Sequence, residues 1–547
     1  MYGIEPLKQS FFSTLQKIFS ISLSDCAPIS FTLNTDEKKS QFGDISTNAA
    51  LIIAKLIGKN PREVANTLIN SFTDASIAKM EIAGPGFLNI FLTDAVFIQF
   101  AQDLLNKKDL FFKKENPQGN YNIEFVSANP TGPLHIGHGR GGIIGDVLAR
   151  VLKFVGHTVT KEHYVNDAGV QMEKLGNSLK IRCQQQLGST IEIPEDGYRG
   201  EYLKELASEC ITEHGQNVIE KDNAFFTEYG YKKLLALLQK TLAQYNIHFD
   251  VWFSERLLHP NRIITALEVL RNNGHLYEKD GAEWFQSTTF GDDKDRVLEK
   301  ADGSVTYAAA DAAYLLDKIS RGFDHLVFVL GQDHHSYPRR LEGLKQALGH
   351  SNISLECIIY QLVSIKEDGE QVRLSKRAGR IIGLGDIIEM AGADVARFFY
   401  LNRKADAHLE FDIDLALSQS DDNPVYYLQY AYVRAFSILK KAHDHVELQN
   451  ITAQDADHLS TQEHILLKKM VDLKELLANI SHNYQVHLIA YYLLDLAQAF
   501  HNYYHHNRVI EPENISQSRA RLLMITLIHE MFNRCLGLMG LSKPETM

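Results

Sequence analysis

Two histidines, His135 and His138, stand where a strand, a glycine-bearing loop and a helix follow one another in the sequence. Residues 121–127 have the β-branched and aromatic content of a strand. Apolar residues within 143–155 recur at helical spacing, which predicts a helix that starts near Gly139. The positive start of a helix suits a phosphate, and the two imidazoles would lie beside it. The stretch therefore predicts a mononucleotide site whose histidines contact ATP phosphates.

The glycines of this stretch allow a second interpretation. Gly137, Gly139 and Gly142 fit the dinucleotide fingerprint G-x-G-x-x-G, and Glu162 follows at the distance expected of a ribose ligand. The protein would then be an NAD-dependent dehydrogenase. The fingerprint, however, needs its first glycine at the strand end, and residues 128–136 intervene here. A tight strand–helix connection with incidental histidines is a third interpretation.

A basic segment later in the chain could hold the same phosphates. A predicted hairpin with an Asp-Gly turn leads into a loop that carries Arg373, Lys376, Arg377 and Arg380 between glycines. Charge runs usually form a solvated face. A glycine-bearing loop with four cations would also clamp a polyphosphate whose charge grows in the transition state. We expect this segment to face the histidines across the nucleotide.

Composition and charge narrow the class of protein. Hydrophobic content of 45% and charged content of 23% are ordinary for a soluble protein. No apolar run approaches the length of a membrane span, so we expect no membrane association. The five scattered cysteines argue against a disulfide framework or zinc knuckle and favour the cytoplasm. The net charge of −12 weakens the case for RNA binding without excluding it, because local basic loops can act on an acidic protein.

The distribution of predicted elements divides the chain into three units. Residues 1–112 combine helices with an apolar strand and predict an α+β domain. Residues 118–410 alternate strands and helices, which predicts a Rossmann-type α/β domain on a parallel sheet, with a helical insertion at about 170–245. Residues 420–547, opened by the predicted helix cap Asn423, contain only helices and predict an all-α bundle.

Two further clusters could bind ligands. Gln332 and Asp333 follow a strongly apolar strand, and ligands of open α/β sheets collect beyond the carboxyl ends of strands. In the last unit, Tyr503, Tyr504 and Arg508 belong to a stripe of aromatic side chains and potential cations. Such a stripe can be a packed core or a platform for stacking on unpaired bases.

Several motifs in family order resemble arginyl-tRNA synthetases. NPTGPLHIGHGRG resembles the HIGH signature of class I aminoacyl-tRNA synthetases, and RLSKRAG resembles their KMSKS loop. The resemblance to the arginine-specific family extends over EFVSANPTGPLHIGHGRG, HYVNDAG, FDVWFSE, TYAAADAAY, GQDHH, GADVARFFYL and DNPVYYLQYAYVR. FGDISTNAA and AGPGFLNI also resemble that family's extra N-terminal domain. These stretches cover nearly the whole chain.

The resemblance implies an enzyme, a ligase that activates L-arginine with ATP and Mg²⁺ and transfers it to tRNA(Arg). It implies catalytic roles for His135, His138 and Lys376. The implied ATP contacts are Pro130, Gly132, His135, Gly137, His138, Gln332, Asp333, Arg373, Ser375, Lys376 and Arg377. A monomeric cytoplasmic protein is expected, with no metal ligands from the chain, a tRNA-contacting first unit and an anticodon-binding last unit that uses Tyr503, Tyr504 and Arg508.

A guanidinium presents a planar fork of donors that carboxylates hold well. Glu124, Asp311 and Glu255 occupy the matching family positions, with Tyr307 packing on the guanidinium and Ser127 and Asn129 holding the amino and carboxylate ends of arginine. Two positions depart from the family pattern. Arg373 replaces the first lysine of the KMSKS pattern, and Leu315 stands where the family usually has a histidine, which would remove a polar contact.

Overall fold

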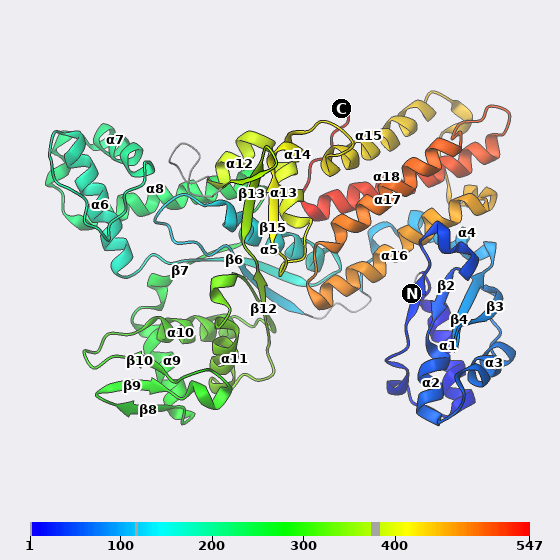
Figure 1. The fold of residues 1–547 in the computed structure, drawn as a ribbon, viewed down its shortest axis with the longest axis horizontal. Coiled ribbons are helices and arrows are strands. Elements are labelled where there is room, and N and C mark those ends of the chain that lie inside the picture. The colour runs from blue at the N-terminus through cyan, green and yellow to red at the C-terminus, as the bar shows by residue number, and fades with distance from the viewer. Residues whose placement is uncertain (1–2, 115–118, 373–382) are drawn as a thin grey trace.

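A five-stranded parallel sheet forms the centre of the molecule (Figure 1). The computed structural model describes residues 3–114, 119–372 and 383–547. Strands β5 (Asn120–Phe125), β6 (Thr158–Val165), β7 (Val251–Ser254), β11 (His325–Gly331) and β12 (Ser354–Tyr360) pair in the order β12-β11-β5-β6-β7. All neighbours run parallel. The predicted Rossmann-type architecture is confirmed, and the carboxyl ends of these strands meet along one edge.

Helix α5 (Ile136–Phe154) follows β5 and lies directly against the sheet. A Cβ at Gly145 would lie 2.3 Å from Cγ of Phe125, so glycine at this position allows the close approach. The predicted start near Gly139 was wrong by one turn. The helix begins at Ile136 because His135 is its N-cap: the side chain of His135 and that of His138 form a reciprocal capping box.

Two appendages extend from the sheet. The helices α6 (Val170–Gln186), α7 (Tyr202–His214) and α8 (Asn223–Gln244) pack around a separate apolar core. A second core joins α9 (Asn261–Asn272), α10 (Tyr307–Ser320) and α11 (Tyr337–Ala347) to the antiparallel sheet β8 (Leu276–Lys279), β9 (Ala282–Phe285) and β10 (Arg296–Glu299). Leu315 is buried in this second core, so its side chain fills apolar space.

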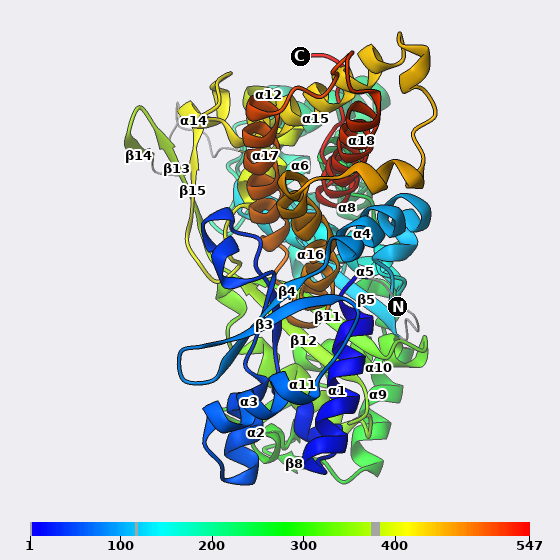
Figure 2. The same cartoon turned by 90° about the vertical axis from the view of Figure 1, so that its right-hand side faces the viewer.

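The N-terminal unit pairs helices with a small antiparallel sheet. Strands β1 (Phe31–Leu33), β2 (Ile45–Thr47), β4 (Phe87–Leu92) and β3 (Ile77–Ala83) are flanked by α1 (Glu5–Phe19), α2 (Ala49–Ile57), α3 (Pro61–Ser71) and α4 (Asp94–Lys107). Asn60 caps α3 by accepting a hydrogen bond from the backbone N–H of Arg62, as the Asn-Pro pair predicts. Figures 1 and 2 show this unit beside the C-terminal helices.

A small sheet and two short helices lead from the central sheet to the bundle. Strand β13 (Val363–Glu367) pairs with β14 (Glu370–Val372) and β15 (Leu409–Asp412). In the sequence, α12 (Leu384–Ala391) and α13 (Ala393–Leu401) lie between β14 and β15, and α14 (Ile413–Leu417) follows β15. Arg397 of α13 is buried and donates to Asp146 Oδ2 of α5 at 2.7 Å and to the carbonyl of Met539 at 2.8 Å. Arg397 therefore links the end of α18 (Ile515–Met539) to α5, the helix that begins at the two histidines.

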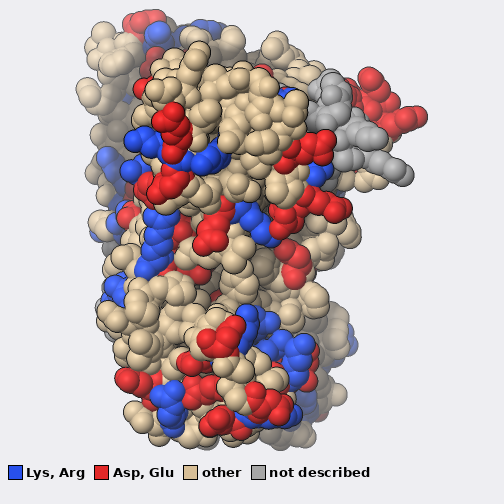
Figure 3. All heavy atoms as spheres, turned by 90° about the vertical axis from the view of Figure 1, so that its left-hand side faces the viewer, with Lys and Arg blue, Asp and Glu red and all other residues tan. Residues whose placement is uncertain are grey.

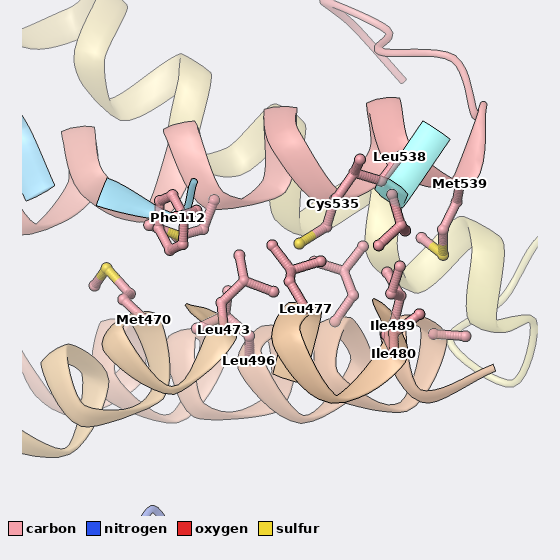
Figure 4. Packing of buried hydrophobic residues seen from close by; sticks show 14 of the residues in the cluster. Phe112, Met470, Leu473, Leu477, Ile480, Ile489, Leu496, Cys535, Leu538 and Met539 are labelled. Carbon is pink, nitrogen blue, oxygen red and sulfur yellow. The ribbon is translucent and has the colours of Figure 1, made fainter. Parts of the chain in front are cut away.

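The C-terminal bundle consists of α15 (Pro424–Ala442), α16 (Thr461–Asn483), α17 (Leu488–His506) and α18 (Ile515–Met539). Figure 4 shows Leu473 and Leu477 of α16 facing Cys535 of α18. By length and composition α18 could cross a membrane, with a mean hydropathy of 1.3, but 72% of that window is buried. The expectation that no apolar run reaches this length was wrong, and the burial indicates a core helix of the bundle.

Candidate active site

His135 and His138 lie together at the carboxyl edge of the sheet. Nδ1 of His135 accepts from the N–H of Gly137 at 3.1 Å, and Nδ1 of His138 accepts from the N–H of His135 at 3.2 Å. The ring centroids are 3.7 Å apart. A Cβ at Gly137 would lie 2.9 Å from Cε1 of His135, so the glycine leaves room for the folded-back ring.

Burial favours the neutral form of both imidazoles. Burial, followed by the nearby His135, lowers the pKa of His138 to about 3. Burial also lowers the pKa of His135, although Asp333 opposes that shift. Because each Nδ1 accepts a hydrogen bond, the proton of the neutral ring sits on Nε2. The site therefore offers two neutral N–H donors beside the positive start of α5.

The loop before α5 lies next to the two histidines in the sequence. Pro130 is buried, Gly132 is half-buried and Asn129 is exposed. Tyr202 of α7 donates to the carbonyl of Thr131 at 2.5 Å, so the helical insertion supports the loop. Residues 129–138 together form the histidine wall.

The predicted opposing segment lies largely beyond what the structure describes. Arg373, Ser375, Lys376 and Arg377 are outside the described residues. Gly383, the first described residue after them, forms a backbone bridge with His135. The N–H of Leu384 donates to the carbonyl of Leu134 at 2.7 Å. The residues that directly follow the basic segment in the sequence, Gly383 and Leu384, therefore contact the histidine wall.

Gln332 and Asp333 form a short 3-10 turn after β11, which neighbours β5 in the sheet. The Asp333 side chain is 79% exposed, and one of its oxygens lies 3.4 Å from Nε2 of His334. Because Asp333 also interacts electrostatically with His135, these residues share the edge with the histidine wall.

Three predicted arginine ligands are carboxylates at the same edge, and Glu124, Glu255 and Asp311 form the carboxylate pocket. Glu124, 7% exposed, accepts from Oγ of Ser127 at 3.0 Å and from the hydroxyl of Tyr314 at 2.8 Å. Ser127 has a left-handed φ of 41° and its Oγ also accepts from the N–H of Tyr164. This unusual backbone conformation at the strand end aims the Ser127 hydroxyl at Glu124.

Among the described residues, Asp311 forms a long ion pair with Arg340, and Glu255 lies near the imidazole of His259. Asp311 Oδ1 accepts from the hydroxyl of Tyr337 at 2.7 Å, while Arg340 lies 3.8 Å away. Burial raises the pKa of Asp311 to about 6, against the effects of Tyr337 and Arg340. Glu255 is 6% exposed, with His259 at 3.7 Å, and burial raises its pKa as well. Half-buried Asp311 and buried Glu255, two carboxylates of raised pKa, are a ready site for a cation.

Tyr307 opens α10 one turn before Asp311 on the same face. Its ring is 75% exposed, so it is free to cover a ligand in the carboxylate pocket. Lys318 and Tyr314 of the same helix also contact the pocket, and the sequence interpretation missed them. The spacing of 311, 314 and 318 places all three on one helical stripe, which was the available signal.

The dehydrogenase interpretation fails at Glu162. This carboxylate is fully buried and binds Arg321 through both oxygens, at 2.6 and 2.9 Å. Burial would raise its pKa, but Lys318 and Arg321 outweigh that effect and hold it at about 2. Glu162 therefore has a structural ion pair and is not available to a ribose.

The predicted tRNA contacts in the bundle divide between core and surface. Tyr503 is buried, and its hydroxyl donates to Glu463 at 2.7 Å, so its ring is a core residue and not a stacking platform. Tyr504 and Arg508 are exposed. Arg434 lies 5.2 Å from the centre of the Tyr504 ring. On the opposite end of the molecule, Figure 3 shows acidic and basic side chains interspersed, without a uniformly basic face.

Comparison with known proteins agrees with this architecture. Residues 5–92 match the arginyl tRNA synthetase N terminal domain, 100–407 the catalytic domain of class I (R) tRNA synthetases, and 428–547 the DALR anticodon binding domain. A protein named arginine–tRNA ligase from Bacillus velezensis is 42% identical to this chain over 97% of both chains. A protein of the same name from Bacillus subtilis is 42% identical over 94% of both chains.

Solved structures give the same result. A putative arginyl-tRNA synthetase from Campylobacter jejuni is 34% identical, with a TM-score of 0.77 over 83% of this chain and all of its own. The arginyl-tRNA synthetase of Thermus thermophilus, at 20% identity, shares the fold over 99% of both chains with a TM-score of 0.77. The chain therefore belongs to the arginyl-tRNA synthetase family of class I aminoacyl-tRNA synthetases.

Proposed function

We propose that this site joins L-arginine to tRNA(Arg) in two steps, with release of AMP and pyrophosphate. The observation that carries the proposal is the meeting of two unlike groups at one sheet edge. The histidine wall offers neutral donors at a helix start, and the carboxylate pocket offers buried and half-buried carboxylates. One side suits a polyphosphate and the other suits a guanidinium.

In the first step the arginine carboxylate attacks the α-phosphorus of ATP, and pyrophosphate leaves. Positioning and charge neutralisation accelerate such a transfer, so no acid–base pair is needed. Nε2 of His135 and of His138 would donate to phosphate oxygens. Mg²⁺ would arrive with the ATP phosphates, since a magnesium ion prefers phosphate oxygens and water to a full set of protein ligands.

Neutralisation of the leaving pyrophosphate is assigned to the basic segment. Lys376 is the main candidate, helped by Arg373, Ser375 and Arg377. Support comes from the sequence position of Gly383, which follows this segment and pairs with His135. Pro130, Gly132, Gly137, Gln332 and Asp333 would complete the ATP site.

Arginine is selected by charge and shape. Asp311 and Glu255 would hold the guanidinium, with the exposed ring of Tyr307 packed on it. The sequence predicted Glu124 as a guanidinium ligand, but we place it with Ser127 and Asn129 at the amino and carboxylate ends, because its oxygens already accept from Ser127 and Tyr314. A site built for a fork of donors discriminates strongly against lysine, because the unused acceptors would stay buried and unpaired.

Transfer to tRNA would use the outer units. The first unit, residues 1–112, would contact tRNA, and residues 420–547 would read the anticodon with Tyr504 and Arg508 on the surface. Residues 118–410, with the insertion at about 170–245, would carry both chemical steps. We expect a monomeric protein of the cytoplasm.

The direct test is ATP–pyrophosphate exchange with each amino acid, run with and without tRNA(Arg), followed by charging of the tRNA. Arginine alone should support exchange and charging. Equal activity with lysine would contradict the assigned selectivity, and inactivity with every amino acid would overturn the proposal. An accompanying assay for NAD binding should be negative.

A further inference from the structure

Lys318 of α10 is a fully buried lysine beneath the carboxylate pocket. Its Nζ lies 3.0 Å from Glu124 and 3.1 Å from Glu162, and it donates to the side-chain oxygen of Asn122. A fully buried ammonium is costly unless it is paired and hydrogen-bonded. These contacts therefore account for its burial, and they connect it to a predicted substrate ligand.

Glu124 and Glu162 share more than this cation. The hydroxyl of Tyr314 contacts both carboxylates, at 2.8 Å from Glu124 and 2.5 Å from Glu162. Two anions that meet at one hydroxyl repel each other unless a cation lies between them. Arg321 also pairs with Glu162 through two hydrogen bonds, whereas Lys318 lies between the two carboxylates and pairs with both.

Among the described residues, Lys318 is the cation that forms an ion pair with Glu124. Other groups near Glu124 come from four elements: Glu162 and Tyr164 of β6, Asp311 and Tyr314 of α10, Tyr337 of α11 and Cys357 of β12. These groups are carboxylates, hydroxyls and a thiol. Lys318 is thus the charged donor that the described residues place against Glu124.

We propose that Lys318 is a positioning residue for arginine: its Nζ holds the Glu124 carboxylate oriented as an acceptor toward Ser127 and the substrate. This inference rests on the proposed function. Lys318 does not touch the substrate itself. It converts one of the three pocket carboxylates into a neutralised hydrogen-bond acceptor, and leaves the charge of Asp311 and Glu255 for the guanidinium.

The consequence of removing Lys318 follows from the pairing. Glu162 keeps Arg321, whereas Glu124 loses the cation that pairs with it among the described residues. Its carboxylate is then no longer fixed as an acceptor toward Ser127 and the substrate. Arginine binding weakens, whereas the histidine wall is unchanged.

The test measures KM for arginine and for ATP in the exchange reaction for Lys318→Met. We expect an arginine KM about tenfold above wild type, with the ATP KM unchanged. Lys345→Met is the matched control, because Lys345 is also buried but binds the carbonyl of Ile353 and Glu342. The control should leave both KM values unchanged.

Two further variants separate positioning from folding. Tyr314→Phe keeps the ring and removes the shared hydroxyl, and should raise the arginine KM about threefold without affecting ATP. In the Lys318→Met, Glu124→Gln double variant the two effects on the arginine KM should not add, because the second substitution removes a partner that is already lost. A wild-type arginine KM in Lys318→Met, an equal rise in both KM values, or additive effects in the double variant would overturn the inference. Failure of the wild-type protein to use arginine would instead overturn the proposed function.

Discussion

The histidine wall and the carboxylate pocket share one sheet edge but are built differently. The wall is contiguous in sequence, half-exposed, and uses uncharged imidazoles fixed by backbone hydrogen bonds. The pocket collects side chains from β5, the end of β7 and α10, and it is ionic, with Glu124 and Glu255 buried and Asp311 half-buried. One region is a local capping device, and the other is a tertiary charge network.

The difference follows from the two ligands that we propose. A triphosphate brings its own charge and counter-ion, so neutral donors can orient it without competing for Mg²⁺. The guanidinium of arginine must be distinguished from the side chains of other amino acids. This requires acceptors in the site that stay without a hydrogen-bond partner when another amino acid binds. The first region should therefore govern rate, and the second should govern selectivity.

Loss of one histidine donor should give the largest effect. His138→Ala should slow arginyl-adenylate formation by about 100-fold or more, because a donor to the transition state is removed. The arginine KM should change little. Single-turnover measurement of adenylate formation checks this, and an unchanged rate would remove His138 from the reaction.

Neutralising the pocket should give a smaller effect of the opposite kind. Asp311→Asn should raise the arginine KM by roughly 10- to 100-fold, since a charge-assisted contact to the guanidinium is lost, and leave the ATP KM within about twofold. Steady-state exchange kinetics provide the measurement. Equal increases for both substrates would mean that the two regions are not separate.

The pocket should also titrate while the wall does not. Because the pKa of Asp311 is about 6, kcat/KM for arginine should fall by up to about tenfold per pH unit below pH 6, as the carboxylate gains a proton. The pKa of His138 is about 3, so kcat/KM for ATP should stay flat over the same range. A parallel decline for both substrates would contradict the assignment.

A stability measurement can test the effect of burying another histidine, His163 of β6. Burial lowers the pKa of His163, which stacks on Trp252, to about 3, and neither ring nitrogen has a hydrogen-bond partner among the described residues. The unfolded chain binds a proton below about pH 6.5 and the folded chain does not, so stability falls as pH decreases from 6.5 toward 3.

Between pH 7 and pH 5, we expect the free energy of unfolding to fall by about 2 kcal/mol less in His163→Phe than in the wild type. Urea unfolding at the two pH values measures the difference. An equal pH dependence in the variant and the wild type would show that His163 is not the titrating group.

The sequence predicted the parts of the site that are local. The βα step at His135 and His138, the strand before Gln332 and the cap at Asn423 were each readable from neighbouring residues. The start of α5 was misplaced because an imidazole cap is not among the usual N-cap residues. Lys318 was missed because a helical lysine is normally solvated, and only tertiary pairing with β5 and β6 reveals its burial.

The most direct test of the account is a crystal structure with arginine and a non-hydrolysable ATP analogue. We predict an α-phosphate oxygen within about 3.2 Å of an Nε2 of His135 or His138, and the guanidinium paired with Asp311 or Glu255. A triphosphate bound away from the start of α5, or a guanidinium that contacts neither carboxylate, would contradict it.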